Sequence, residues 1–155
     1  MENVHFSSVT NEWGTPLKLF EALDREFSFT LDPCSTHENA KCKKHYTEKE
    51  NGLSQSWDGE IVFMNPPYGR EIGYWIRKAV KSYATVVCLI PARTDTKYWH
   101  EWIFPYADEI RFLSGRVRFQ GGKYSAPFPS AIVVFRPVFD RKFAMAVPVI
   151  TKQEI

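Results

Sequence analysis

Apolar residues recur at helical spacing in three segments of the chain. The first segment is a predicted helix over residues 15–27, where Thr15 is suited to capping the first turn and Pro16 has no amide hydrogen to leave unpaired. The other two predicted helices cover residues 72–83 and 94–104. The apolar positions expected to face inward in the three helices are Leu19, Phe20, Leu23 and Phe27, then Ile72, Trp75, Ile76, Ala79, Val80 and Tyr83, then Tyr98, Trp102 and Ile103.

Short apolar runs separate these helices and predict buried strands. Residues 61–64 (IVFM) and 85–90 (TVVCLI) have the length of strands and are far too short to span a membrane. Further strands are predicted at residues 28–33, 109–113 and 131–135, and the polar stretch 36–46 is a predicted helix with frayed ends. Strands that alternate with amphipathic helices indicate an α/β fold with a mostly parallel sheet and helices on both faces.

Composition and length predict the number of domains and the cellular compartment. A chain of 155 residues with 44% apolar content predicts a single domain over residues 1–155 that buries a substantial core. Three cysteines do not form a paired disulfide framework, and the first residues lack the basic and apolar regions of a signal peptide. We therefore expect a cytoplasmic protein with no membrane partner.

The net charge of +2 says little, but one segment is strongly basic. Residues 111–123 (RFLSGRVRFQGGK) contain four basic residues and no acidic one. Basic residues interleaved with aromatics and glycines are typical of a surface that follows a nucleic-acid backbone. An exposed hairpin with solvated charges explains the same pattern, and both interpretations remain open.

Two predicted strands end in residues suited to binding. Residues 61–64 run into Asn65-Pro66-Pro67-Tyr68, and an earlier strand ends at Asp32. In parallel α/β sheets, ligands bind beyond the carboxyl ends of the strands. The asparagine oxygen and a prolyl carbonyl are hydrogen-bond acceptors and tyrosine offers a flat face, which suits a planar substrate with an exocyclic amino group. Prolines that merely end a strand are the competing interpretation.

A cluster of soft ligands raises a metal alternative. Cys34, His37, Cys42 and His45 have the spacing C-x2-H-x4-C-x2-H, which can bind zinc. This interpretation predicts a different class of protein, a small zinc-stapled module that binds nucleic acid. A domain of this size needs no metal for stability, and we expect no metal site here.

The strand end resembles a known catalytic motif. Asn65-Pro66-Pro67-Tyr68 is similar to the (Asp/Asn)-Pro-Pro-(Tyr/Phe) motif of S-adenosylmethionine-dependent amino-methyltransferases. The order of motifs from about Asn11 to Phe135 resembles the phage-type DNA N6-adenine methyltransferases. The other matching segments are EWGTP (12–16), LDPCSTHENAKC (31–42), NGL (51–53), GRVRF (115–119) and APFPSAIVVF (126–135).

This resemblance implies a reaction and a fold. It implies transfer of a methyl group from S-adenosyl-L-methionine to adenine N6 of double-stranded DNA, with the base flipped out of the duplex. Asn65 and the Pro66 carbonyl, with Pro67 fixing the turn, would hold the amino group while Tyr68 stacks on the base. The implied fold is a compact Rossmann-like sheet, mostly parallel with a late antiparallel hairpin.

The resemblance places Trp13, Thr15 and Pro16 against the methionine part of the cofactor. The Asp32 carboxylate, at the end of its strand, suits the methionine ammonium or a ribose hydroxyl, although Asp-Pro is also a common turn opener. The predicted cofactor set also includes Pro33, Cys34 and Asn65, and Glu48 is a weaker candidate for the ribose. Two departures from the family pattern are visible, because no Gly-x-Gly follows Asp32 and only 33 positions separate Asp32 from Asn65. We therefore expect that one or more of the usual strands is missing.

DNA contacts are expected from four cations, Arg93, Arg116, Arg118 and Lys123. Phe119 can stack on the other face of a flipped base or pack in the core. No separate target-recognition domain is expected, and a homodimer is left open. The same acceptor chemistry also suits an amide of protein glutamine or adenine in RNA, so these substrates remain alternatives. If the chain is phage-encoded, its location would be the host cytoplasm.

Overall fold

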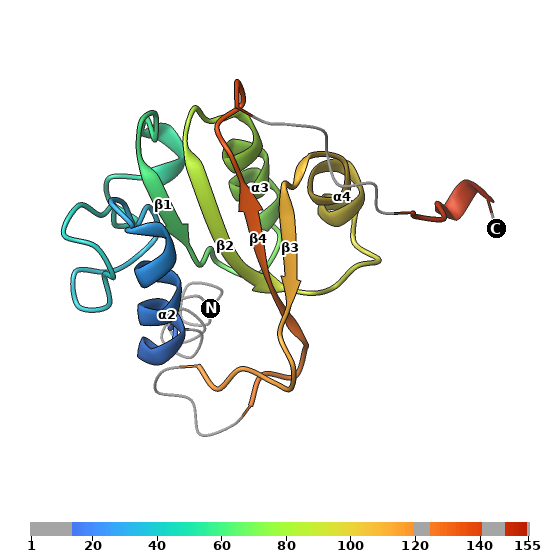
Figure 1. Ribbon diagram of the computed structural model, residues 1–155, viewed down its shortest axis with the longest axis horizontal. Coiled ribbons are helices and arrows are strands. Elements are labelled where there is room, and N and C mark those ends of the chain that lie inside the picture. The colour runs from blue at the N-terminus through green and yellow to red at the C-terminus, as the bar shows by residue number, and fades with distance from the viewer. Residues whose placement is uncertain (1–13, 120–124, 141–147, 155) are drawn as a thin grey trace.

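The computed structural model describes residues 14–119, 125–140 and 148–154. Its centre is a four-stranded sheet in the order β1-β2-β4-β3, formed by β1 (Ile61–Met64), β2 (Thr85–Pro91), β4 (Ser130–Phe135) and β3 (Glu109–Phe112) (Figure 1). β1 and β2 are parallel, whereas β4 is antiparallel to both β2 and β3. Three strands thus share one direction, which confirms the mostly parallel sheet with a late antiparallel hairpin.

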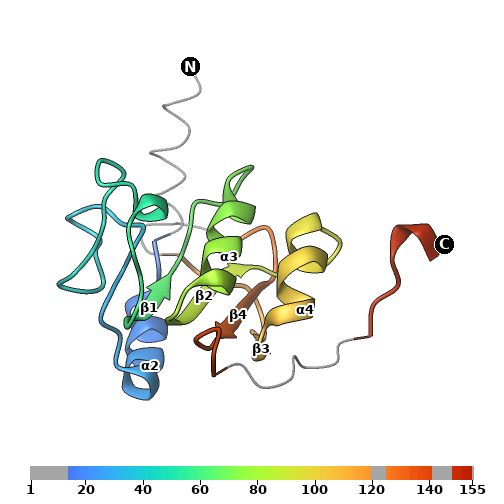
Figure 2. The ribbon, with the colours of Figure 1, turned by 90° about the horizontal axis from the view of Figure 1, so that it is seen from above.

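Helices cover both faces of the sheet because alternate strand residues point to opposite sides (Figure 2). On one face, Phe20 and Leu23 of α2 (Leu17–Phe27) pack against Phe63 of β1. On the other face, α3 (Ile72–Lys81) and α4 (Phe104–Tyr106), with the turn before α4, cover Val62 and Met64. The prediction of helices on both faces is confirmed. Within the part of the chain that the structure describes, no helix has the length and apolarity to cross a membrane.

The start of α2 differs from the prediction. Pro16 is the N-cap residue, and no side chain caps the helix, so the predicted cap by Thr15 is wrong. The Thr15 hydroxyl instead contacts the residue that follows β1, as described below. At the other end, Ser28 takes a left-handed conformation and its N–H bonds to the Asp24 carbonyl.

The third predicted helix contains a wider turn than expected. Residues Trp99–Ile103 form a π-helical turn, in which the Phe104 N–H bonds to the Trp99 carbonyl five residues earlier. This turn rotates the buried face, so that Trp99 and Ile103 are fully buried. Tyr98 and Trp102, predicted to face inward, are only half-buried. Tyr83 is likewise exposed, because α3 ends at Lys81.

The segment before β1 is more irregular than predicted. The predicted strand at residues 28–33 is reduced to two parallel bridges, Leu31 with Val62 and Asp32 with His45. Residues 36–46 are not helical, because they return alongside Asp32 as a loop whose Lys44 carbonyl accepts the Asp32 N–H. Between Asp32 and β1 the only helical element is the 3-10 turn Gly52–Ser54, and no strand of the four-stranded sheet lies there.

Candidate active site

Asn65 follows β1 directly, at the carboxyl end of the strand. Its side-chain nitrogen donates to the Thr15 hydroxyl at 3.0 Å, and its backbone oxygen accepts from the Cys34 thiol at 3.3 Å. Thr15 is buried, with 3% of its surface exposed. Since the amide nitrogen donates to Thr15, this hydrogen bond fixes the orientation of the amide. Thr15 therefore positions Asn65.

Asp32 lies beside Asn65 and is buried, with 4% of its surface exposed. Its carboxylate accepts the backbone N–H of Lys41 at 3.0 Å and that of Cys34 at 3.4 Å. Burial raises the pKa of Asp32 above its usual range, and the two N–H groups partly oppose this shift. A buried carboxylate of this kind is suited to a cationic ligand, because an opposite charge offsets the cost of burial.

Cys34 joins these two residues. Its N–H reaches Asp32 while its thiol donates to the Asn65 carbonyl. Burial raises the pKa of the Cys34 thiol well above its usual value, so the thiol stays protonated and remains a donor. The sequence-predicted residues Thr15, Asp32, Cys34 and Asn65 are thus brought together. Trp13, also predicted for this site, lies outside the described residues.

Tyr68 is fixed against the neighbouring strand. Its hydroxyl donates to the Leu89 carbonyl of β2 at 3.0 Å. Phe119 and Phe128 meet its ring edge-to-face, with centroids 6.1 and 5.6 Å away. Phe119 is buried, so its core interpretation is the one that the structure favours. Burial also raises the pKa of Tyr68 well above its usual value.

Sequence reasoning missed the role of Gly52, which entered only as part of the family-like segment NGL (51–53). The Gly52 backbone lies so close to Pro33 that an added Cβ would stand 2.0 Å from the Pro33 carbonyl oxygen. The Trp57 indole donates to the Gly52 carbonyl at 3.0 Å, which fixes the glycine from the other side. Asn51, with φ of 56°, begins this turn, so the Asn-Gly pair was the signal that could have revealed the contact.

We expect Gly52→Ala to lower the stability of the protein by about 1–3 kcal/mol or more, because the methyl group must displace backbone at Pro33. Chemical denaturation at equilibrium measures this change. Gly73→Ala is the matched control, since its Cβ would meet only the Tyr98 Cβ at 3.8 Å and alanine favours the helix. Equal stability of the Gly52→Ala variant and the wild type would contradict the close contact.

The zinc alternative finds no support in the geometry. The His37 and His45 rings contact each other, with Nδ1 and Nε2 2.9 Å apart, but the Cys34 thiol is directed at Asn65. Among the residues that the structure describes, no three candidate ligands gather in one place. Glu48, the weaker ribose candidate, is exposed in the turn before Asn51.

Two of the predicted DNA-binding cations lie near Tyr68. The Arg93 guanidinium lies 5.0 Å from the Phe128 ring centroid, and the Arg116 side chain donates to the Ala126 carbonyl at 3.4 Å. Both cations therefore contact the segment 126–128, which also touches Tyr68. Arg118 is exposed on the same chain segment as Arg116, and Lys123 lies outside the described residues.

The mostly parallel α/β sheet with its antiparallel strand is consistent with the methyltransferase-like class of folds. Residues 4–154 match the family described as DNA N-6-adenine-methyltransferase (Dam). The chain belongs to this family and is a DNA N6-adenine methyltransferase.

Two phage proteins illustrate the similarity. The DNA N-6-adenine-methyltransferase of Haemophilus phage HP1 is 29% identical over 136 residues, which is 81% of this chain and 78% of that protein. The DNA N-6-adenine-methyltransferase of Escherichia phage T1 is 28% identical over 99 residues, 61% of this chain and 41% of that longer protein.

Proposed function

We propose that this enzyme takes the methyl group from S-adenosyl-L-methionine and transfers it to N6 of an adenine that is flipped out of duplex DNA. The observation that carries the proposal is the pairing of an oriented amide at Asn65 with a buried carboxylate at Asp32, joined through Cys34. The first group suits the acceptor amine, and the second suits a cationic methyl donor.

The acceptor side is explained by the electronics of adenine. The lone pair of its amino group is delocalised into the ring, so the nitrogen is a poor nucleophile. The Asn65 oxygen and the Pro66 carbonyl accept the two amino hydrogens and favour the tetrahedral nitrogen that forms as the N–C bond is made. This stabilisation is largest in the transition state and therefore raises kcat.

The residues around Asp32 fit the chemistry of the methyl donor. The methyl donor carries an ammonium group, and Asp32 supplies a buried carboxylate whose raised pKa falls when a cation binds. Asp32, Pro33 and Cys34 would hold the donor, and Thr15 and Pro16 would close its other side. When bound, S-adenosylmethionine supplies the electrophilic methyl group. An adenine amino group that accepts the methyl group at N6 would release one proton.

The duplex is bound by cations beside Tyr68. Arg93, Arg116 and Arg118 would contact phosphates, an interaction that weakens as salt rises. Tyr68 supplies the face on which the flipped adenine stacks. Its ring is already fixed by Leu89, so this platform is formed before DNA binds.

The function is tested with S-adenosylmethionine labelled in its methyl group. Duplex DNA, RNA and a protein extract are incubated separately with the enzyme, and labelled DNA is digested to nucleosides. We expect label in DNA alone, as N6-methyl-2′-deoxyadenosine. Label in RNA or protein but not in DNA would overturn the DNA assignment, and label in cytosine would overturn the adenine assignment.

Removing the hydrogen bond between Thr15 and Asn65 is expected to lower kcat about tenfold. Thr15→Val keeps the shape of the side chain and removes its acceptor, so the amide at residue 65 loses its fixed orientation. Steady-state kinetics should show a change in kcat with little change in the KM for DNA. Thr15→Ser keeps the hydroxyl and should restore turnover, whereas equal rates for the valine variant and the wild type would contradict a positioning role.

A further inference from the structure

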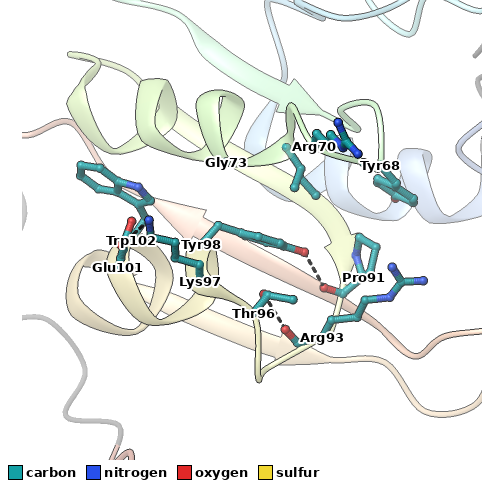
Figure 3. A pocket seen from close by; sticks show the side chains of 12 residues that line it. Tyr68, Arg70, Gly73, Pro91, Arg93, Thr96, Lys97, Tyr98, Glu101 and Trp102 are labelled. Carbon is teal, nitrogen blue, oxygen red and sulfur yellow. Dashed lines mark hydrogen bonds and ion pairs between the residues drawn. The ribbon is translucent and has the colours of Figure 1, made fainter. Parts of the chain in front are cut away.

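A cavity of about 390 Å³ lies next to Tyr68, on the α3 side of the sheet. Figure 3 shows Tyr68, Arg70 and Arg93 at one end, Lys97, Glu101 and Trp102 at the other, and Tyr98 between them. The residues proposed to bind the methyl donor do not line it. Asp32 lies on the far side of β1 from β2, whereas this cavity lies beyond the end of β2, so the two sites are separate.

The lining combines charge with aromatic surface. Arg70, Arg93 and Lys97 outnumber the single carboxylate of Glu101, so the cavity has a net positive charge. A Glu101 carboxylate oxygen lies 3.5 Å from the Lys97 ammonium nitrogen, so these two charges pair. The remaining positive charge, on Arg70 and Arg93, therefore lies at the end near Tyr68. That end suits an anionic group such as a phosphate.

The aromatic walls are held in place. The Tyr98 hydroxyl donates to the Pro91 carbonyl at 3.5 Å, and the neighbouring Trp99 indole donates to the same oxygen at 3.1 Å. Trp102 packs against Tyr106 and beneath the Lys81 ammonium. Aromatic side chains fixed in this way are surfaces on which nucleobases stack, independent of sequence.

The cavity is open and continuous with the proposed DNA surface. Lys97 at its rim is 85% exposed, so a polymer can enter and leave. Arg93 lines the cavity and also lies over Phe128, next to the segment that holds Arg116. Tyr68 is shared between the cavity and the proposed stacking site.

We propose that this cavity binds the nucleotide adjoining the flipped adenine on the same DNA strand. Arg70 and Arg93 bind its phosphate, and Tyr98 and Trp102 provide the surface for its base. The inference rests on the proposed function and adds a second DNA subsite to it, with Arg70, Tyr98 and Trp102 as new contact residues.

The test compares Arg70→Gln and Trp102→Leu with wild type. DNA affinity is measured at several salt concentrations by fluorescence anisotropy, and donor affinity is measured by calorimetry. In Arg70→Gln the slope of log K against log salt should shrink by about one, as expected when one phosphate contact is lost. Trp102→Leu should weaken DNA binding about tenfold with the slope unchanged. Lys152→Gln, on the distant η3 turn (Lys152–Glu154), is the control and should match wild type.

Each outcome decides between the two proposals. If wild type methylates DNA but Arg70→Gln keeps the full slope and Trp102→Leu keeps full affinity, the subsite is wrong and the proposed function stands. If the same variants weaken donor binding instead, the cavity belongs to the methyl donor and the subsite is again wrong. If wild type methylates no DNA, the proposed function itself fails.

Discussion

Asn65→Ala is expected to lower kcat by about 10³-fold or more, equivalent to a loss of about 4 kcal/mol of transition-state stabilisation. The variant loses the acceptor that favours the tetrahedral amine. Its methyl-donor affinity should change little, because the side chain donates to Thr15 and its oxygen is proposed to hold the acceptor amine, whereas Asp32 is proposed to bind the donor. Single-turnover kinetics on duplex DNA, with donor affinity measured by calorimetry, separate the two effects.

Asn65→Asp is the informative companion to the alanine variant. Aspartate keeps an acceptor at the same place and can take a hydrogen bond from the Thr15 hydroxyl, so partial turnover should return. Wild-type turnover in Asn65→Ala would show that the amine is activated elsewhere, and the mechanism proposed above would then be abandoned. A folded-state check by circular dichroism excludes loss of structure as the cause.

The second large effect is expected at Asp32, where Asp32→Asn should weaken binding of the methyl donor by about 10- to 100-fold. The substitution keeps the size of the side chain but removes its charge. It also keeps an acceptor for only one of the two N–H groups of Lys41 and Cys34, because these donate to different carboxylate oxygens. Calorimetric titration with S-adenosylmethionine measures the change. Unchanged affinity would place the ammonium of the donor elsewhere.

The pH dependence at Asp32 has a defined sign. Burial raises the pKa of the folded-state carboxyl above its unfolded value, so ionisation costs stability and the ligand-free protein loses stability as pH rises through that raised pKa. The donor binds the ionised form. Its affinity in the wild type should therefore fall as pH is lowered through the same pKa, and Asp32→Asn should lose this dependence.

The raised pKa of Asp32 also predicts that its charge contributes to binding of the methyl donor and not to the stability of the ligand-free protein. At neutral pH, ligand-free Asp32→Asn is relieved of a buried charge, but one of the two backbone N–H groups loses its acceptor, so its melting temperature should stay close to that of wild type. Adding the donor should raise the melting temperature of wild type more than that of the variant. Differential scanning calorimetry with and without the donor measures both quantities. An equal rise in melting temperature on adding the donor to both proteins would show that the Asp32 charge does not bind the donor.

Much of the sheet could be predicted because its strands are wholly apolar. The runs at β1 and β2, and the helical spacing in α2 and α3, led directly to the observed elements. The segment 28–46 could not be predicted, since its polar residues carry no periodic apolar stripe. Its path is set by bonds between Asp32 and the later loop, which no local pattern reveals.

The candidate site, like the fold, was predictable from the sequence only in part. A strand end with Asn65-Pro66-Pro67-Tyr68 was visible in the sequence, because its residue types carry the chemistry. The partner of Asn65 was not visible, since Thr15 lies 50 positions earlier and was assigned to a helix cap. The π-helical turn at Trp99–Ile103 was also hidden, because one additional residue per turn shifts which aromatics face the cavity.

The hydrogen bond from Tyr68 to Leu89 determines whether Tyr68 can accept the proton that the methylated nitrogen must release. The phenol is already donating to a strand carbonyl and its pKa is raised by burial, so it remains neutral and is no base. Tyr68 therefore does not take up the proton that the methylated nitrogen releases. The alkaline limb of the rate profile should then be the same in wild type and Tyr68→Phe.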